Sequence, residues 1–403
     1  MDVQPLYDLS PLARIMLAGV LAALGPLAWV WLCNKNASTA RWLQALTLLT
    51  LFLTFDLVLF GAFTRLTDSG LGCPDWPGCY GNASPVGATV AITAAQSAMP
   101  TGPVTHGKAW VEMIHRYLSS GVGVLILTLA VASWVQRRRV ATRRKHITSG
   151  GHVINPWGPT VTLVWVCVQG AFGALTVTMK LFPAIVTLHL LGGMALLALL
   201  CAQAVRATQA QGDLAPVPLP TSTRIMLGLT FALVACQIAL GGWVSTNYAM
   251  LACTQFPMCQ NSWWPQMDFH HGFQIWRALG LVQDGSHIDF SALTAIHFTH
   301  RLFSYAVFAA LGLLAWRLRR TAAMRPQARW IAGLALWQFA TGLSNVVLGW
   351  PLVAAVSHTG GAAALVVVLT WSLFASRGVP HSVADAATHI ATAPKLPTSR
   401  LSA

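Results

Sequence analysis

Long apolar segments constrain the fold of this chain more than any other feature of its sequence. Nine predominantly apolar runs occur, at about 12–33, 42–63, 112–136, 158–178, 184–206, 224–246, 291–317, 328–349 and 352–376. Crossing the hydrocarbon core of a bilayer takes about 20 such residues. Inside lipid each span must satisfy its own backbone hydrogen bonds. The sequence therefore predicts an all-α integral membrane protein with about nine transmembrane helices.

Composition supports the same fold class. Charged residues make up 9% of the chain and apolar residues 55%, whereas soluble domains carry about 25% charged residues. Lipid rather than water must therefore solvate most of the surface. We expect the first run to be a membrane helix rather than a signal peptide, because Asp2 and Asp8 precede it and it is long for such a peptide.

The net charge of +14 comes mainly from basic loops between spans. If the loops after the third and seventh runs are cytoplasmic, 18 of the 25 Lys and Arg lie inside, as the positive-inside rule expects. We therefore interpret the charge as a topology signal and expect no nucleic-acid partner. The N-terminus is then outside, the C-terminus is cytoplasmic, and the long loops 64–111 and 247–290 face the oxidising side. The basic residues of the two loops are Arg137, Arg138, Arg139, Arg143, Arg144, Lys145, Arg317, Arg319, Arg320, Arg325 and Arg329.

The chain contains two copies of one plan. GAFTRLTDSGLGCPDWPGC (61–79) aligns with GGWVSTNYAMLACTQFPMC (241–259) at an offset of 180 residues. Each segment ends a span and enters a loop with two cysteines separated by five residues. Because the copies run in the same direction, an axis along the membrane normal should relate them. The cysteines are Cys73 and Cys79 in the first loop, and Cys253 and Cys259 in the second.

The duplication predicts a domain organisation. We expect two tandem pseudo-symmetric four-helix bundles, at 42–206 and 224–376. An extra N-terminal transmembrane helix at 1–41 precedes them. The segment 377–403 is rich in Ala, Pro, Ser and Thr, a composition typical of a disordered tail.

Four histidines recur at equivalent places in the two halves. His115 aligns with His300 and His189 with His358, and ionisable residues within spans are functional candidates because they are costly there. Two imidazoles from neighbouring helices are what a six-coordinate haem iron needs. The chain has no CxxCH motif, so attachment would be non-covalent. An interhelical hydrogen bond is the alternative for any single histidine, but the repeated pairs favour haem.

Charged residues beside these histidines distinguish the two halves. Arg116 and Arg301 directly follow a histidine and are candidates to bind a haem propionate, with snorkelling to lipid headgroups as the alternative. Glu112, the only glutamate, lies three residues before His115, where the second half has His297. This asymmetry indicates a reactive first-half site, at which the carboxylate takes a proton or stabilises positive charge. The alternative is a carboxylate that only holds its neighbours in place.

Each cysteine loop is expected to form a disulfide, because it faces the oxidising side. The cysteine spacing suits zinc less well. For Cys73 and Cys79, close to the reactive half, a redox-active role competes with a structural one. Asp56 is expected to be buried in the second span, where it either pairs with a neighbouring helix or belongs to a proton path.

Five segments together resemble the haem A synthases, a cytochrome oxidase assembly family. They are TRLTDSGLGCPDWPGCYG (64–81), VEMIHR (111–116), LHLLGG (188–193), GGWVST (241–246) and HFTHRL (297–302). The resemblance runs from about 42 to 376. It implies an oxidoreductase that converts the C8 methyl of haem O to a formyl group, by successive hydroxylation with loss of water, to give haem A for cytochrome c oxidase. The extra helix at about 12–33 departs from the eight-helix members.

The resemblance also implies roles for single residues. His300 and His358 match the pair that holds a resident haem b as axial iron ligands. His115 and His189 match the pair at the substrate site, where haem O is oxidised, and Glu112 matches the essential carboxylate. The cysteine loops match those of members that have them. The cofactor-binding candidates are Arg65, Arg116 and Arg301, together with His300 and His358.

The resemblance further implies partners and a location. We expect the chain in the bacterial cell membrane, with its histidines toward the outer face. The expected partners are haem O and haem A, the lipid bilayer, haem O synthase and cytochrome c oxidase assembly factors, and a homo-oligomer is also open. A bis-histidine cytochrome b that only transfers electrons, and a haem transporter or chaperone, are the alternatives. The lone Glu112 and the dissimilar halves favour an enzyme.

Overall fold

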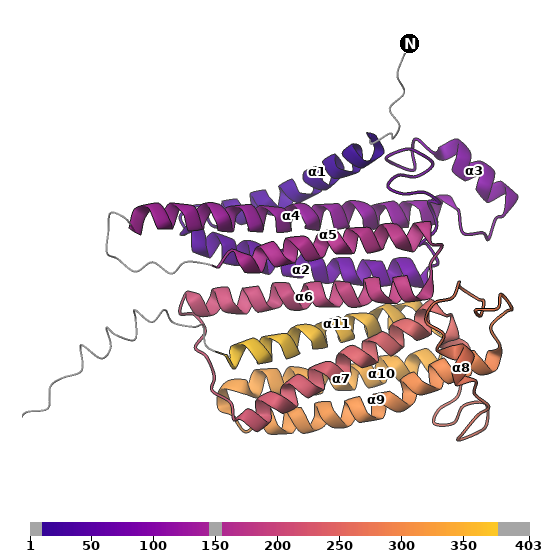
Figure 1. The fold of residues 1–403 in the computed structure, drawn as a ribbon. Helices are drawn as coiled ribbons and strands as arrows, with labels where there is room; N and C mark the ends of the chain where they lie inside the picture. Colours follow the sequence, from indigo (N-terminus) through magenta and orange to yellow (C-terminus); the bar gives the residue numbers. More distant parts are fainter. Residues whose placement is uncertain (1–9, 145–154, 378–403) are drawn as a thin grey trace, which may run out of the picture.

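The computed structural model describes residues 10–144 and 155–377, and in these ranges the regular structure is entirely helical. The segment 145–154 lies outside the described residues. The tail from 378 onward, for which we expected disorder, also lies outside them. Figure 1 shows long helices packed side by side, with short helices in the loops. The long helices are α1 (Ser10–Cys33), α2 (Thr39–Leu66), α4 (His106–Arg144), α5 (Trp157–Thr178), α6 (Pro183–Ala210), α7 (Thr221–Thr246), α9 (Phe290–Leu318), α10 (Arg325–Val347) and α11 (Leu352–Ala375).

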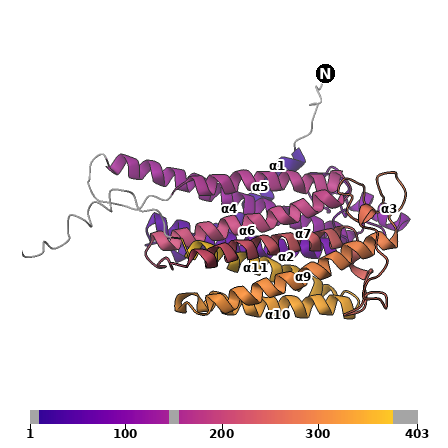
Figure 2. The same ribbon diagram turned by 60° about the horizontal axis from the view of Figure 1, so that its bottom comes forward.

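Eight helices in the described part of the chain are long and apolar enough to cross a membrane: α1, α2, α4, α5, α6, α7, α9 and α11. The prediction of an all-helical, multi-pass membrane protein is confirmed. The expected span at 328–349 forms α10, which is not among the eight. Its buried polar residues, such as Gln327, Gln338 and Asn345, reduce its apolar content. It nevertheless lies alongside α9 and α11 for much of the bundle (Figure 2).

Threonines inside the helices are satisfied locally. In α2 the hydroxyls of Thr47, Thr50 and Thr54 donate to the carbonyls four residues earlier, at 2.7–2.8 Å. A buried hydroxyl in lipid has no water to bond, so bonding to its own helix removes the cost. These side chains therefore need no partner on another helix.

The two halves pack with approximate two-fold symmetry. Helices α2, α4, α5 and α6 form the first bundle, and α7, α9, α10 and α11 form the second. Between them α6 packs on α7, α11 packs on α2, and α6 packs on its own counterpart α11. Each contact is thus matched by its symmetric equivalent, as expected for a two-fold arrangement.

Aligned residues of the two halves contact each other at one end of this interface. Arg65 Nη2 donates to the carbonyl of Ser245 at 2.6 Å, and the Tyr248 hydroxyl donates to Asp68 Oδ1 at 2.6 Å. Both pairs are 180 residues apart, which is the repeat offset. Residues meet their own equivalents only near a two-fold axis, so the axis passes between the C-terminal ends of α2 and α7. Burial raises the pKa of Tyr248 above its usual value, which keeps this hydroxyl a donor.

The connections differ between the two ends of the bundle. Both cysteine loops lie at one end (Figure 1), with α3 (Thr89–Ala98), α8 (Phe269–Gly272) and the short helix η1 (Ala249–Leu251). The opposite end carries the α9–α10 connection with η2 (Ala322–Met324) and the basic C-terminal part of α4. The bundle therefore has the two cysteine loops at one end and basic residues at the opposite end.

Helix α1 has no counterpart in the second half and packs mainly on α4. A Cβ at Gly19 would lie 2.6 Å from Ser120 Cβ and 2.9 Å from its carbonyl carbon. The close approach of the two helices therefore depends on the missing side chain. Gly25, further along α1, has nothing within 4 Å of its Cβ position.

We predict that Gly19→Val destabilises the protein by about 1–3 kcal/mol, because overpacking pushes α1 away from α4. Gly312→Val is the matched control: it makes the same change at an exposed position of another membrane helix, α9, with nothing within 4 Å of the Cβ position. The midpoint of thermal unfolding in detergent should fall for Gly19→Val and stay near wild type for the control. Equal midpoints for the two variants would contradict this account of the packing.

Candidate functional site

One cavity, of about 1110 Å³, is lined by helices of both halves. Its volume exceeds the roughly 300–1,000 Å³ of most small-molecule sites. Its lining includes His115, His189, His300 and His358, so the structure brings together the four histidines that the sequence singled out. The histidines of each half reach the cavity from two different helices, α4 and α6 in the first half and α9 and α11 in the second.

Each of the two aligned histidines, His115 on α4 and His300 on α9, faces a glycine on a neighbouring helix, α2 or α7. A Cβ at Gly61 would lie 3.1 Å from His115 Nε2, and a Cβ at Gly241 would lie 3.0 Å from His300 Cε1. Both distances are tighter than ordinary carbon contacts. The missing side chains therefore leave room for the imidazoles.

The second histidine of each half shows the same arrangement. A Cβ at Gly173 would lie 3.6 Å from His189 Cε1, and a Cβ at Gly342 would lie 3.3 Å from His358 Cε1. The sequence reasoning did not single out these four glycines. A signal for them was present in the repeat: Gly173 and Gly342 are 169 residues apart, as are His189 and His358, and Gly61 and Gly241 align at the offset of 180 residues.

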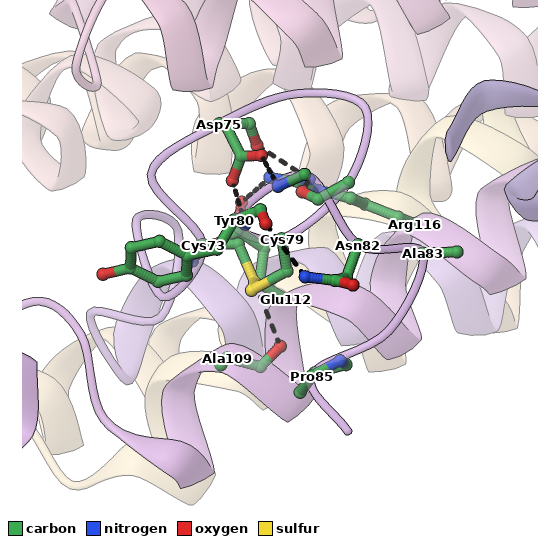
Figure 3. The surroundings of a disulfide bond; sticks show 12 residues. Cys73, Asp75, Cys79, Tyr80, Asn82, Ala83, Pro85, Ala109, Glu112 and Arg116 are labelled. Carbon is green, nitrogen blue, oxygen red and sulfur yellow. Dashed lines mark hydrogen bonds and ion pairs between the residues drawn. A yellow bond between two sulfur atoms is a disulfide. The ribbon is translucent and has the colours of Figure 1, made fainter. Parts of the chain in front are cut away.

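Glu112 joins α4 to the first cysteine loop. Its side chain is buried, and Oε2 accepts a hydrogen bond from the Cys73 N–H at 2.8 Å. Oε1 forms an ion pair with Nη2 of Arg116. Figure 3 shows this carboxylate beneath the disulfide loop. Glu112 also lines the cavity, so one side chain contacts both the loop and the candidate site.

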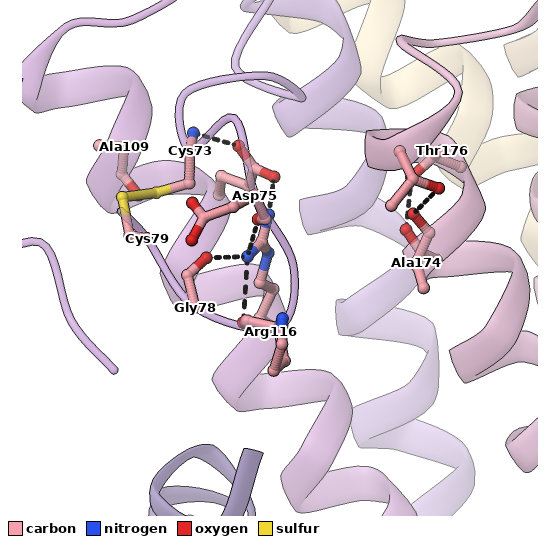
Figure 4. A network of polar contacts seen from close by, with 12 residues as sticks. Cys73, Asp75, Gly78, Cys79, Ala109, Arg116, Ala174 and Thr176 are labelled. Carbon is pink, nitrogen blue, oxygen red and sulfur yellow. Dashed lines mark hydrogen bonds and ion pairs between the residues drawn. A yellow bond between two sulfur atoms is a disulfide. The ribbon is translucent and has the colours of Figure 1, made fainter. Parts of the chain in front are cut away.

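The arginines that follow the histidines hold the cysteine loops. Arg116 Nη1 donates to the carbonyls of Asp75 and Pro77 at 3.0 and 3.1 Å, and also to that of Gly78 (Figure 4). Arg301 donates to the carbonyls of Met258 and Cys253, at 3.1 and 3.3 Å. Both side chains are buried and line the cavity. Their guanidinium groups thus have partners within the chain, and the propionate contacts stay a prediction.

Both cysteine pairs form disulfides, Cys73–Cys79 and Cys253–Cys259, as expected. A redox-active role for the first pair stays a prediction. In the second half His297 Nδ1 donates to the carbonyl of Ala249 at 3.1 Å. His297 therefore ties its helix to the second loop, as Glu112 does for the first, although only Glu112 brings a carboxylate.

Asp56 lies differently from our expectation, whereas cofactor binding by Arg65 stays a prediction. Arg65 is held at the interface between the halves by Ser245 and Tyr248, although it also lines the cavity. Asp56 is exposed on the outer face of α2, so the expectation of burial is wrong. The reason is its register, since the exposed Phe52 lies one turn before it and residues four apart share a helix face.

The fold and the site define a class: a multi-pass helical membrane protein with a duplicated bundle and a pair of cavity-lining histidines in each half. Comparison with known proteins narrows this class. The family described as "Cytochrome oxidase assembly protein" matches residues 20–370. This chain belongs to that family.

Relatives in several bacteria are named haem A synthase. The protein of Shewanella oneidensis is 36% identical over 321 residues, which cover 80% of this chain and 92% of the relative. That of Methylorubrum extorquens is 29% identical over 368 residues, covering 87% and 89%. That of Halalkalibacterium halodurans is 25% identical over 308 residues, covering 74% and 85%. The similarity thus extends over both halves of the chain.

We predict that Arg116→Leu loosens the first cysteine loop selectively. The change removes the hydrogen bonds to the loop carbonyls and leaves the buried Glu112 unpaired, a loss of about 3–5 kcal/mol for a buried pair. Reduction of Cys73–Cys79 by a water-soluble phosphine should become at least about 10-fold faster, since every 1.4 kcal/mol is a factor of ten. Alkylation followed by peptide mass spectrometry measures both disulfides in one sample.

The Cys253–Cys259 disulfide is the internal control for this experiment. Its reduction rate should not change in Arg116→Leu, and Arg301→Leu should reverse the selectivity. If both disulfides respond equally to each variant, the arginines do not hold separate loops.

Proposed function

We propose that this chain is a haem A synthase, an oxidoreductase that converts the C8 methyl of haem O to a formyl group. The observation that carries the proposal is the pair of half-buried histidines in each half, lining one cavity, with the only glutamate beside one pair. The family and the names of the relatives support the same activity. Two successive hydroxylations of the methyl and loss of water yield the aldehyde.

The residues present fit haem. The four imidazoles are half-buried at the wall of the cavity and lie against glycines that leave space beside each ring. The Nδ1 atom of His189 is buried without a hydrogen-bond partner in the described part of the chain, although buried polar groups are normally satisfied.

We assign the second-half pair to the resident cofactor and the first-half pair to the substrate. His300 and His358 would hold haem b, which supplies a one-electron redox centre when bound. His115 and His189 would hold haem O and fix its orientation in the cavity. Arg65, Arg116 and Arg301 line the same cavity and would present positive charge to the propionates.

Glu112 would act at the substrate site as a fixed negative charge that accepts a proton or stabilises positive charge at the methyl carbon. Its position suits this role, because the Cys73 N–H and Arg116 hold the carboxylate in one place. Pre-organised charge is effective in a water-excluded site, since the surrounding groups need not reorient during the reaction. The disulfide loop would thus position the carboxylate.

The ends of the bundle support one orientation. Basic residues gather at the end opposite the cysteine loops, and such residues favour the cytoplasmic side. We therefore place the disulfides and the histidine sites toward the outer face, the N-terminus outside and the C-terminus in the cytoplasm.

Pigment extracted from cells that express this chain together with a haem O source should contain haem A. Glu112→Gln keeps an oxygen that accepts the Cys73 N–H but removes the charge, so haem A formation should fall at least about 100-fold, within the range for a lost acid–base group. Bound haem should remain, as shown by absorption spectroscopy. Haem extraction and chromatography measure the product.

Two results of this experiment count against the proposal. Absence of haem A with the wild-type chain, despite bound haem, would favour a bis-histidine electron carrier or a haem carrier. A normal rate in Glu112→Gln would mean that Glu112 only positions the loop.

His300→Ala and His358→Ala should each abolish the low-spin spectrum of the resident haem, because each removes one of the two axial ligands. His115→Ala serves as the comparison, since it should retain that spectrum while losing haem A formation. Retention of the low-spin signal in both second-half variants would refute the assignment of this site.

A further inference from the structure

A hydroxyl group supports one imidazole of the second half. Thr341 Oγ1 lies 3.0 Å from His358 Nδ1, and the same hydroxyl donates to the carbonyl of Trp337 at 2.8 Å. A hydroxyl has one proton to donate, so its contact with Nδ1 must be an accepted hydrogen bond. His358 therefore carries its proton on Nδ1, which leaves the Nε2 lone pair free for a metal.

An amide group supports the other imidazole of this half. Gln237 Nε2 lies 3.1 Å from His300 Nδ1, 3.4 Å from His300 Nε2 and 3.1 Å from the His300 carbonyl. Its Oε1 is buried and has no partner in the described part of the chain. When Nε2 binds iron, Nδ1 carries the proton. The amide would then turn over to present its free Oε1 to Nδ1, giving up the hydrogen bond to the His300 carbonyl.

The first half has no polar side chain at either equivalent position. Leu57 stands where the repeat places Gln237, and Phe172 stands where it places Thr341. Neither side chain can donate or accept a hydrogen bond. Consistent with this, His189 Nδ1 is buried without a partner, whereas its counterpart His358 is bonded.

Such outer partners change how strongly an imidazole holds a metal. A group that accepts the Nδ1 proton fixes the ring orientation and raises the basicity of Nε2, and losing it typically lowers metal affinity by about 10–100-fold. Greater electron donation also favours ferric over ferrous iron, which lowers the reduction potential. Two otherwise similar histidine pairs thereby differ in how firmly they keep a haem.

We propose that Thr341 and Gln237 are positioning residues that make the second-half site retain its haem, and that their apolar counterparts Phe172 and Leu57 leave the first-half site able to exchange haem. This inference rests on the proposed function, in which one haem is resident and the other enters as substrate and leaves as product. It adds the physical basis for that division of roles. Each site has two imidazole ligands of its own. The sites differ in the side chains that are placed to hydrogen-bond those imidazoles.

The test uses the full-length protein purified with its haems. Thr341→Val and Gln237→Leu should each release the second-half haem to excess apomyoglobin at least about 10-fold faster than wild type. Thr341→Val should also raise the midpoint potential of the low-spin haem in a spectroelectrochemical titration. Thr341→Ser restores the hydroxyl, so it should return both values toward wild type.

Thr299→Val is the matched control. It removes a threonine hydroxyl next to His300, but this hydroxyl donates to the carbonyl of Ala295 at 2.7 Å and contacts no imidazole. Its haem release and potential should match wild type. Phe172→Thr is the reverse change, and it should slow release from the first-half site by giving His189 Nδ1 a partner.

The outcomes separate this inference from the proposed function. If the wild-type chain binds no haem at either site, the proposed function fails. If it binds haem and Thr341→Val and Gln237→Leu release it no faster than Thr299→Val, only the present inference is overturned. Faster release without a change in potential, or without recovery in Thr341→Ser, would indicate loosened packing and would also overturn it.

Discussion

The need to satisfy every buried polar group in a lipid environment governs this structure. Lipid offers no hydrogen bond to an imidazole, carboxylate or guanidinium inside the bundle, so each is best satisfied by a partner in the chain or in a ligand. Glu112 and Arg116 meet this need through each other and through the first cysteine loop. Thr341 does so for His358. His189 Nδ1 is left without a partner, and the candidate site lies around it.

Duplication explains both the similarity and the difference of the halves. Two copies of one helical plan place histidines, facing glycines and disulfide loops at equivalent points about a two-fold axis, near which Arg65 meets Ser245. The repeat then allows one copy to change while the other keeps its role. At the position of Glu112 the second half has His297, and each ties its helix to its own loop. Only the first half has a carboxylate at this position.

The disulfide loops are part of the site rather than separate from it. In each half, the arginine that follows a histidine donates hydrogen bonds to backbone carbonyls of the loop. A change in a loop would therefore reach the arginine that directly follows the imidazole in the sequence. This coupling gives the two long loops a role in positioning side chains of the site.

The sequence by itself determined the helical membrane class, the duplication and the four histidines, because span length, repeat offset and residue type follow from local pattern alone. It also predicted the two disulfides. It failed for Asp56, whose exposure depends on which face of α2 its neighbours cover, and it overstated the apolar character of α10. Only the tertiary structure decided that Arg116 and Arg301 hold the loops, that glycines stand opposite the imidazoles, and that Thr341 and Gln237 support one pair. These contacts join residues far apart in the chain, and their geometry is set by helix packing, which no local pattern encodes.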